Sequence, residues 1–174
     1  MSTLFQPITI GAVRIRNRIV LPPMVRHHGD AAGCVTDAVL EYYGRRAAAG
    51  TGLIIVEATA VEPAGRTWPG GLCAYAPAHG PGLAALAERI HAEGAAAMLQ
   101  LVHGGPKALP GLSGEESVAP SAVQPSGSRP IPLALTIERI HAIEARFAAA
   151  AGLAVEAGFD GVEIHGAHGY LLDA

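Results

Sequence analysis

Four apolar segments recur along the chain, and β-branched residues are frequent within them. Such continuous apolar runs are typical of strands that are buried on both faces of a parallel sheet. The segments cover residues 19–24, 53–61, 96–102 and about 161–165. Because each lies far from the next in the sequence, the connections between them are long enough to contain helices.

Helical spacing of apolar residues fills the intervals between these segments. The first predicted helix begins at Thr36, its N-cap, and Asp37, and it ends at Gly50. The second ends at Gly94 and the third begins at Thr136. Their apolar faces carry Leu83, Leu86, Ala87 and Ile90 in the second, and Ile140, Ile143, Phe147, Ala151 and Ala154 in the third. Strands alternating with helices predict an α/β fold built on a parallel sheet.

Two further segments complete the expected architecture. Residues 4–18 predict a short β-hairpin around Gly11, ahead of the first strand. Residues 103–135 are rich in Gly, Pro and Ser and predict a long loop or lid, which at this length is usually either functional or disordered. No linker or low-complexity tract divides residues 1–174, so we expect one domain. The glycine fingerprint of a dinucleotide-binding fold is missing after the first strand, which counts against a Rossmann fold.

Composition and charge narrow the class of protein. Half of the residues are apolar, 16% are charged and the net charge is -3. Without a basic run, we expect neither nucleic acid nor a membrane as a partner. The first 18 residues contain charges and a proline where a signal peptide would be apolar, and no apolar run approaches the ~20 residues of a membrane span. Cys34 and Cys73 lack metal-site spacing, so we expect reduced thiols in a cytoplasmic protein.

Polar residues gather where the predicted strands end. In a parallel barrel the chemistry lies at the carboxyl ends of the strands and in the loops that follow. These positions hold Pro23, Met24, Val25, Arg26, His27 and His28 after the first strand, Glu57 and Ala58 on the second, Gln100 and His103 on the third, and His165, His168 and Tyr170 after the fourth. They are therefore the candidate site residues.

Each candidate also has a structural interpretation. A histidine in a loop is more often solvated or hydrogen-bonded than catalytic, and an ion pair with an arginine would account for Glu57 and Glu163. Gln100 within an apolar strand needs a partner, because burying an amide without one costs roughly 1–3 kcal/mol. His103, His165 and His168 could belong to a metal site. However, the chain has no HExxH motif and no cysteine ligand, so we predict no metal.

The strand ends resemble the Old Yellow Enzyme family of FMN-dependent ene-reductases. The matching stretches, in family order and spacing, are LFQPITIGAVRIRNRIVLPPM, TDAVLEYYGRRAAAGTGLIIVEATAV, LQLVHGG, APSAV and EAGFDGVEIHGAHGYLLDA. They cover nearly the whole chain, and the IVLPPM end of the first stretch and the whole last stretch are specific to this group. The resemblance implies a TIM (β/α)8 barrel, of which this chain is the N-terminal half.

The resemblance also implies roles for individual residues. Pro23, Met24 and Val25 would lie against the flavin ring, Ala58 would contact it through its backbone, and Gln100 would hydrogen-bond its pyrimidine side. His165 and His168 would bind the carbonyl or nitro oxygen of an electron-poor alkene, and we assign His27 to the substrate side with them. Tyr170 would donate the proton to the substrate carbon, acting as a general acid. The implied activity is hydride transfer from NAD(P)H through FMN to the alkene.

The chain departs from the family in three respects. Val25 stands where relatives often carry Thr or Cys and cannot donate a hydrogen bond, and Pro106 replaces the Arg of the family's HxGR motif after the third strand. A complete barrel takes ~250 residues, and in the family the second half supplies an Arg near the flavin and the cradle for the FMN phosphate. We therefore expect a partner, either a C-terminal half-barrel chain or a second copy, unless the sequence is a fragment. The alternatives are a non-catalytic half-barrel that pairs with another chain and, least favoured, a metal-dependent hydrolase.

Overall fold

Four parallel strands form the central sheet of the computed structural model, which describes residues 3–124, 127 and 129–174. They lie side by side in the order β3 (Val20–Leu21), β4 (Leu53–Ala60), β5 (Ala96–Val102), β8 (Gly161–Ile164). The predicted α/β fold with a parallel sheet is confirmed. β3 is shorter than expected, because Pro22 and Pro23 have no N–H to donate to a strand ladder.

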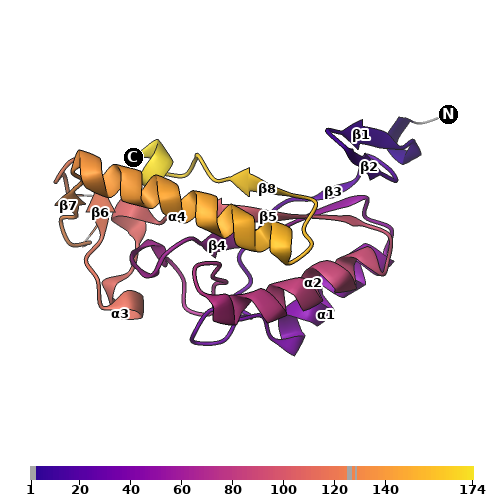
Figure 1. Ribbon diagram of the computed structural model, residues 1–174, viewed down its shortest axis with the longest axis horizontal. Coiled ribbons are helices and arrows are strands. Elements are labelled where there is room, and N and C mark those ends of the chain that lie inside the picture. Colours follow the sequence, from indigo (N-terminus) through magenta and orange to yellow (C-terminus); the bar gives the residue numbers. More distant parts are fainter. Residues whose placement is uncertain (1–2, 125–126, 128) are drawn as a thin grey trace.

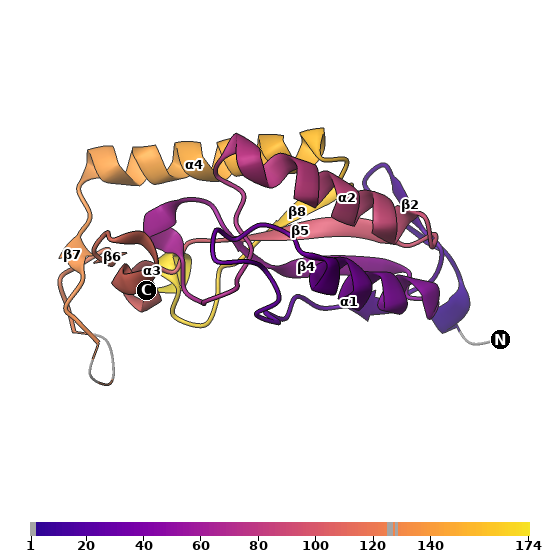
Figure 2. The same ribbon diagram turned by 90° about the horizontal axis from the view of Figure 1, so that it is seen from below.

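Three long helices, α1 (Asp37–Ala48), α2 (Gly80–His91) and α4 (Ile137–Glu156), run alongside the sheet (Figures 1 and 2). Gly50, with φ +98°, follows the end of α1 as predicted. Thr136 caps α4, because its side chain accepts a hydrogen bond from the Arg139 N–H. Thr36 precedes α1 without capping it through its side chain, and its hydroxyl instead donates to the His28 carbonyl at 2.6 Å.

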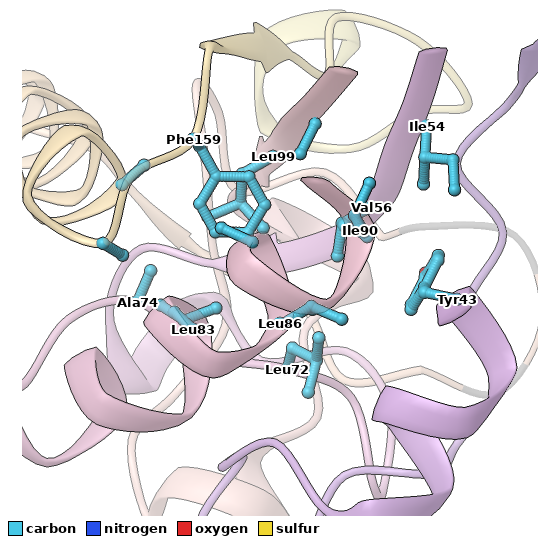
Figure 3. Close-up of a cluster of buried hydrophobic side chains, with 14 of the residues drawn as sticks. Tyr43, Ile54, Val56, Leu72, Ala74, Leu83, Leu86, Ile90, Leu99 and Phe159 are labelled. Carbon is cyan, nitrogen blue, oxygen red and sulfur yellow. The ribbon is translucent and has the colours of Figure 1, made fainter. Parts of the chain in front are cut away.

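The main core lies between these helices and the two central strands (Figure 3). Ile54 and Val56 of β4 and Leu99 of β5 are fully buried against Leu86 and Ile90 of α2. Burying a side chain of this kind stabilises the fold by about 1.5–3 kcal/mol. The four apolar residues that predict the buried face of α2, Leu83, Leu86, Ala87 and Ile90, all lie in this core.

The N-terminal hairpin closes the end of the sheet where the strands begin. β1 (Ile8–Ile10) pairs antiparallel with β2 (Val13–Ile15), and the turn contains Gly11 at φ +59°. Ile15 packs with Leu53 and Ala96, the first residues of β4 and β5, in a second apolar cluster. The predicted hairpin is therefore confirmed, and it lies at the opposite end of the molecule from β6 and β7 (Figures 1 and 2).

The long segment 103–135 contains short elements of its own beside the carboxyl ends of the strands. They are a 3-10 turn (η4, Gly105–Lys107), α3 (Pro110–Ser113), β6 (Val118–Ala119) and β7 (Leu133–Ala134), and the last two pair in parallel. Residues 125, 126 and 128 lie outside the described residues. The remaining short 3-10 helices are η1 (Thr3–Phe5), η2 (Pro63–Gly65), η3 (Pro77–His79) and η5 (Leu171–Asp173).

Candidate functional site

The segment after β3 contains apolar side chains and one histidine with an unusual backbone conformation. Met24 is 48% exposed, whereas Pro23 and Val25 are half-buried. His27 has a left-handed backbone, at φ 58°, and its Nδ1 lies 2.8 Å from the Pro69 carbonyl oxygen. The structure therefore places His27 at the end of this segment, held by the loop that follows β4.

An irregularity in β4 lies beside this segment. Val56 faces Leu99 of β5, but the next facing pair is Thr59 and Leu101, so Glu57 and Ala58 lack a regular partner on β5. A β-bulge of this kind re-aims side chains and interrupts the pairing of backbone groups. Ala58, assigned to a backbone contact with a flavin, is thus part of an irregular stretch of the sheet.

Gln100 has a partner within the sheet. The residue is 7% exposed, and its Nε2 donates to Glu163 Oε1 on β8 at 2.6 Å. This contact supplies one of the hydrogen-bond partners that a buried amide needs. The partner of Glu163 is thus an amide, not the arginine considered from sequence. The second N–H and the carbonyl oxygen of Gln100 remain able to bond another molecule.

Three of the assigned residues come together after β8. His168 Nδ1 lies 3.3 Å from His165 Nε2, and the ring of Tyr170 stands edge-on to His165 with 4.9 Å between centroids. His165 is buried, whereas His168 is exposed and Tyr170 is half-buried. The structure therefore builds a compact cluster with two imidazoles and one phenol.

The hydrogen bonds of the cluster define where the imidazole protons lie. His165 Nδ1 accepts the Ala167 N–H at 3.3 Å, which assigns the His165 proton to Nε2, facing His168 Nδ1. His168 then carries its own proton on Nε2. Burial, together with the neighbouring His168, lowers the pKa of His165, while Glu163 and Asp173 act against this shift. His165 is therefore neutral at pH 7.

The phenol of Tyr170 is also shifted toward its neutral form. Burial raises the pKa of Tyr170, and the positive charge of Arg129 partly offsets that effect. Trp68 packs edge-on against the Tyr170 ring at 5.5 Å between centroids. Tyr170 is thus held in a fixed place and remains protonated at neutral pH.

Two of the histidines assigned to substrate binding have a strained backbone. Among the residues that the structure describes, His27 and His168 are the two with positive φ that are not glycine, at 58° and 62°. Left-handed backbone is unusual for a side chain of this size and is found most often where the surrounding structure serves a function. Both were assigned to substrate binding from sequence.

Three residues of this neighbourhood were not singled out from the sequence. Trp68 lies against Tyr170, Lys107 Nζ donates to the His168 carbonyl and lies 5.5 Å from the centre of the Tyr170 ring, and Arg129 donates to the Lys107 carbonyl at 2.7 Å. Trp68 is the only tryptophan in the chain, and this rarity was the one sequence feature that could have marked it as a candidate site residue. Lys107 and Arg129 belong to the 103–135 segment, whose path no local pattern reveals.

The stretch His103-Gly104-Gly105-Pro106 forms a buried polar network. His103 Nε2 lies 2.7 Å from Glu62 Oε1, and His103 Nδ1 accepts the Gly105 N–H at 3.0 Å. Arg139 of α4 donates to the same oxygen of Glu62. A guanidinium therefore reaches this network from α4, although Pro106 stands where the family motif has its arginine. His103 and Arg139 lower the pKa of Glu62 against the opposing effect of its burial.

The described part of the chain lacks two other classes of feature. No group of three or more His, Cys, Asp or Glu side chains there is arranged to hold a metal ion. No helix within the same residues combines the length and apolar character needed to cross a bilayer.

Comparisons with known proteins identify the relatives of this chain. A model of the NADH:flavin oxidoreductase / NADH oxidase family matches residues 3–174. An NADPH dehydrogenase of Listeria welshimeri is 44% identical over 174 residues, covering 99% of this chain and 50% of the relative. An NADPH dehydrogenase of Clostridium acetobutylicum is 41% identical over 170 residues, covering 98% of this chain and 50% of the relative.

The fold also matches solved structures. An old yellow enzyme homologue from Zymomonas mobilis superimposes with a TM-score of 0.91 at 34% identity, covering 99% of this chain and 50% of that structure. The described fold is therefore that of half of an old yellow enzyme barrel. The chain spans about half the length of the curated relatives that it matches. Because the family match extends over nearly all its residues, the chain belongs to the NADH:flavin oxidoreductase / NADH oxidase family.

Proposed function

We propose that this chain contributes the substrate-binding and proton-donating half of an FMN-dependent ene-reductase, which uses NAD(P)H to reduce an electron-poor alkene such as an enone. The cluster formed by His165, His168 and Tyr170 after β8 carries the proposal. The names of the relatives, NADPH dehydrogenase and old yellow enzyme homologue, support it. We place the activity in the cytoplasm, since Cys34 and Cys73 are both free thiols.

The residues assigned to FMN suit a flat ring with a polar edge. Met24 offers an exposed apolar side chain, Ala58 offers backbone in an interrupted stretch of β4, and Gln100 retains an N–H and a carbonyl oxygen beyond its bond to Glu163. Pro23 and Val25 extend the apolar wall, although Val25 has no hydrogen bond to give. When bound, FMN supplies the two-electron carrier chemistry that amino-acid side chains lack.

In this proposal the substrate oxygen replaces His168 Nδ1 as the acceptor of the His165 Nε2–H and also accepts from the His168 Nε2–H, so that both histidines bind and polarise it. A neutral imidazole donates a hydrogen bond without losing its proton, and the lowered pKa of His165 keeps it neutral at pH 7. Donors that are already oriented toward an oxygen on which charge develops stabilise that charge by about 3 kcal/mol each in favourable sites. His27, which has a left-handed backbone and lies 2.8 Å from the Pro69 carbonyl oxygen through its Nδ1, is assigned to substrate binding with them.

Tyr170 donates a proton to the substrate carbon. Its raised pKa keeps the hydroxyl protonated, and its contacts with Trp68 and His165 limit its rotation. A positioned general acid of this kind accelerates a reaction by roughly 10²–10⁴. Segment 103–135, through Lys107 and Arg129, lies beside the same phenol, and we propose that it serves as the lid of a single domain.

A second candidate is a non-catalytic half-barrel that pairs with another chain. Apolar side chains on the two outer strands favour pairing, because Val20 of β3 is 45% exposed and Ile164 of β8 is 49% exposed. A C-terminal half-barrel chain or a second copy would cover them. The same surfaces serve the first proposal, so pairing and catalysis are compatible.

The visible spectrum of the protein tests the proposal. The chain is purified with FMN, alone and after co-expression with the second half of the Listeria welshimeri relative. We expect flavin absorbance that survives gel filtration in the paired sample, bleaches with NADPH without oxygen, and returns on adding 2-cyclohexenone. A paired sample that stays colourless would overturn the flavin proposal. A coloured sample that bleaches but ignores alkenes would overturn the ene-reductase activity.

A further inference from the structure

A buried carboxyl joins the two strand ends to which the flavin contacts are assigned. Glu57 precedes Ala58 on β4, and it is 1% exposed. Its Oε2 accepts the main-chain N–H of Arg26 at 3.1 Å and the hydroxyl of Tyr43 at 3.3 Å. Through this one oxygen, β4 is tied both to the segment after β3 and to α1.

The bond between Glu57 and Tyr43 runs in both directions. The Tyr43 hydroxyl accepts the main-chain N–H of Glu57 at 2.8 Å, at the position where β4 lacks a regular partner on β5. Tyr43 is 1% exposed, and its ring packs in the main core (Figure 3). The phenol of Tyr43 therefore replaces a strand partner and anchors the bulge to α1.

The energetic balance of this carboxyl is unfavourable. Glu57 Oε1 is buried without a hydrogen-bond partner among the described residues, and Glu57 forms no ion pair with them. Leaving such an atom unsatisfied destabilises a fold, and a well-packed apolar side chain at the same place is often more stable. Thus, the contacts of Glu57 are better explained by the geometry they impose than by stability.

We propose that Glu57 is a positioning residue that holds the Val25–His27 segment against the β4 bulge, and so fixes the spacing between the two walls of the flavin site. The Glu57 clasp consists of the Glu57 carboxyl, the Tyr43 hydroxyl and the Arg26 main-chain N–H. Its role toward flavin rests on the proposed function, whereas its contacts do not.

The protonation state of Glu57 gives the clasp a measurable signature. Burial raises the pKa of Glu57 to about 7, while the Arg26 N–H, the Tyr43 hydroxyl and the charges of His27 and Arg26 oppose this shift. An ionised carboxylate accepts a hydrogen bond more strongly than a neutral acid. We therefore expect the bond to the Arg26 N–H to strengthen as the pH rises through 7.

The first test follows the Arg26 amide by NMR between pH 5 and 9 in the full chain without flavin. We expect its proton shift to titrate with a midpoint near 7 and to become flat in Glu57→Gln, which cannot ionise. Glu62→Gln is the matched control, because Glu62 is another buried carboxyl after the same strand but bonds to His103 and Arg139. His27→Asn removes a charge that lowers the pKa of Glu57, so the titration should persist with its midpoint moved upward.

The second test measures FMN affinity by quenching of flavin fluorescence in the paired protein. Glu57→Leu removes the acceptor at similar volume, and we expect it to raise the Kd about tenfold, as for the loss of one charge-assisted hydrogen bond. Glu57→Gln keeps an acceptor oxygen and should restore the Kd to within about threefold of wild type. A carboxyl with only a packing role would not show this rescue.

The outcomes separate the clasp from the flavin proposal. An Arg26 amide that does not titrate, or that titrates unchanged in Glu57→Gln, would overturn the clasp whatever flavin does. Equal FMN affinity in wild type and Glu57→Leu would overturn its role at the site. If the wild-type paired protein binds no flavin but the Arg26 amide still titrates as expected, the proposed function would be overturned and the clasp supported.

Discussion

The two ends of the sheet differ in how far their polar groups are hydrogen-bonded. Where the strands begin, polar groups are matched: Asn17 bonds with the Gly50 carbonyl and the Ile19 N–H, and Asp160 bonds with His91 and the Ala97 N–H. Where the strands end, two buried atoms lack partners among the described residues, and two histidines have left-handed backbone. The unmatched atoms are Glu57 Oε1 and Arg66 Nε.

The contrast separates what holds the fold from what the fold offers to a ligand. Barrel enzymes place catalytic residues at the carboxyl ends of their strands and use the other end for stability. Strain and unsatisfied groups persist in a protein only when the surrounding structure compensates for them. We therefore expect substitutions at the carboxyl end to alter binding and rate, and substitutions at the amino end to alter the free energy of unfolding.

The largest effect is expected for Tyr170→Phe in the paired enzyme. Removing the proposed acid should lower kcat for 2-cyclohexenone by roughly 10²–10⁴, while the melting temperature and FMN affinity stay near wild type. The control is Tyr42→Phe, which leaves the Tyr42 ring under the Arg46 guanidinium and lies on α1 outside the cluster. Steady-state kinetics and thermal unfolding check both variants. Full activity in Tyr170→Phe would remove Tyr170 from the mechanism.

The next effect is the pH dependence of stability caused by Glu57. Its pKa rises from 4.5 to about 7 on folding, so the folded state binds the proton more tightly than the unfolded state. The free energy of unfolding should therefore fall as the pH rises from about 4.5 to 7, by about 3 kcal/mol in total. Urea unfolding at pH 5 and pH 7.5 measures this difference.

Glu57→Gln isolates this contribution from other titrating groups. The lowered pKa of His165 acts in the opposite direction, because stability falls as the pH drops below the unfolded value of 6.5. The lowered pKa of Glu62 acts only below about 4.5. The slope lost on changing Glu57 to Gln belongs to Glu57, and an unchanged slope would contradict the prediction.

At the amino end, Arg16→Ala should cost stability without affecting the site. The Arg16 guanidinium donates to the carbonyls of Ala47 in the last turn of α1, of Thr51 after α1 and of Glu93 after α2. We expect a loss of about 2 kcal/mol, as for hydrogen bonds to a charged group, and FMN affinity should stay unchanged. Arg14→Ala, on the same hairpin and exposed, should change stability by less than about 0.5 kcal/mol. Equal losses in both would contradict this role.

Sequence patterns predicted the regular strands of the fold better than they predicted the site. The apolar run 96–102 became β5 without a change of bounds, because burial on both faces leaves a continuous signal. The cluster of His165, His168 and Tyr170 was predicted because all three follow one strand. The Glu57 clasp could not be predicted, because no local sequence pattern marks the β4 bulge where Glu57 contacts Tyr43 and Arg26. Lys107 and Arg129 reach Tyr170 only through the tertiary path of a long segment.

The smallest effect concerns backbone strain at the two ends. His168 has φ 62°, and its carbonyl is held by Lys107 through a contact that any residue would keep. His168→Gly should therefore raise the free energy of unfolding by up to about 1 kcal/mol. Gly158, at φ +88° before β8, is the counterpart at the amino end, and Gly158→Ala should lower stability by about 1 kcal/mol although its Cβ would meet no atom.

Urea unfolding of both variants sharpens the comparison of the two ends. A gain in stability at His168 together with a loss at Gly158 would mean that left-handed backbone is carried by histidine only where the proposed ligand binds. A loss in His168→Gly would mean that the 3.3 Å contact with His165 outweighs the strain of its backbone. In that case the histidine pair would contribute to stability, and the carboxyl end could no longer be regarded as strained for the sake of binding.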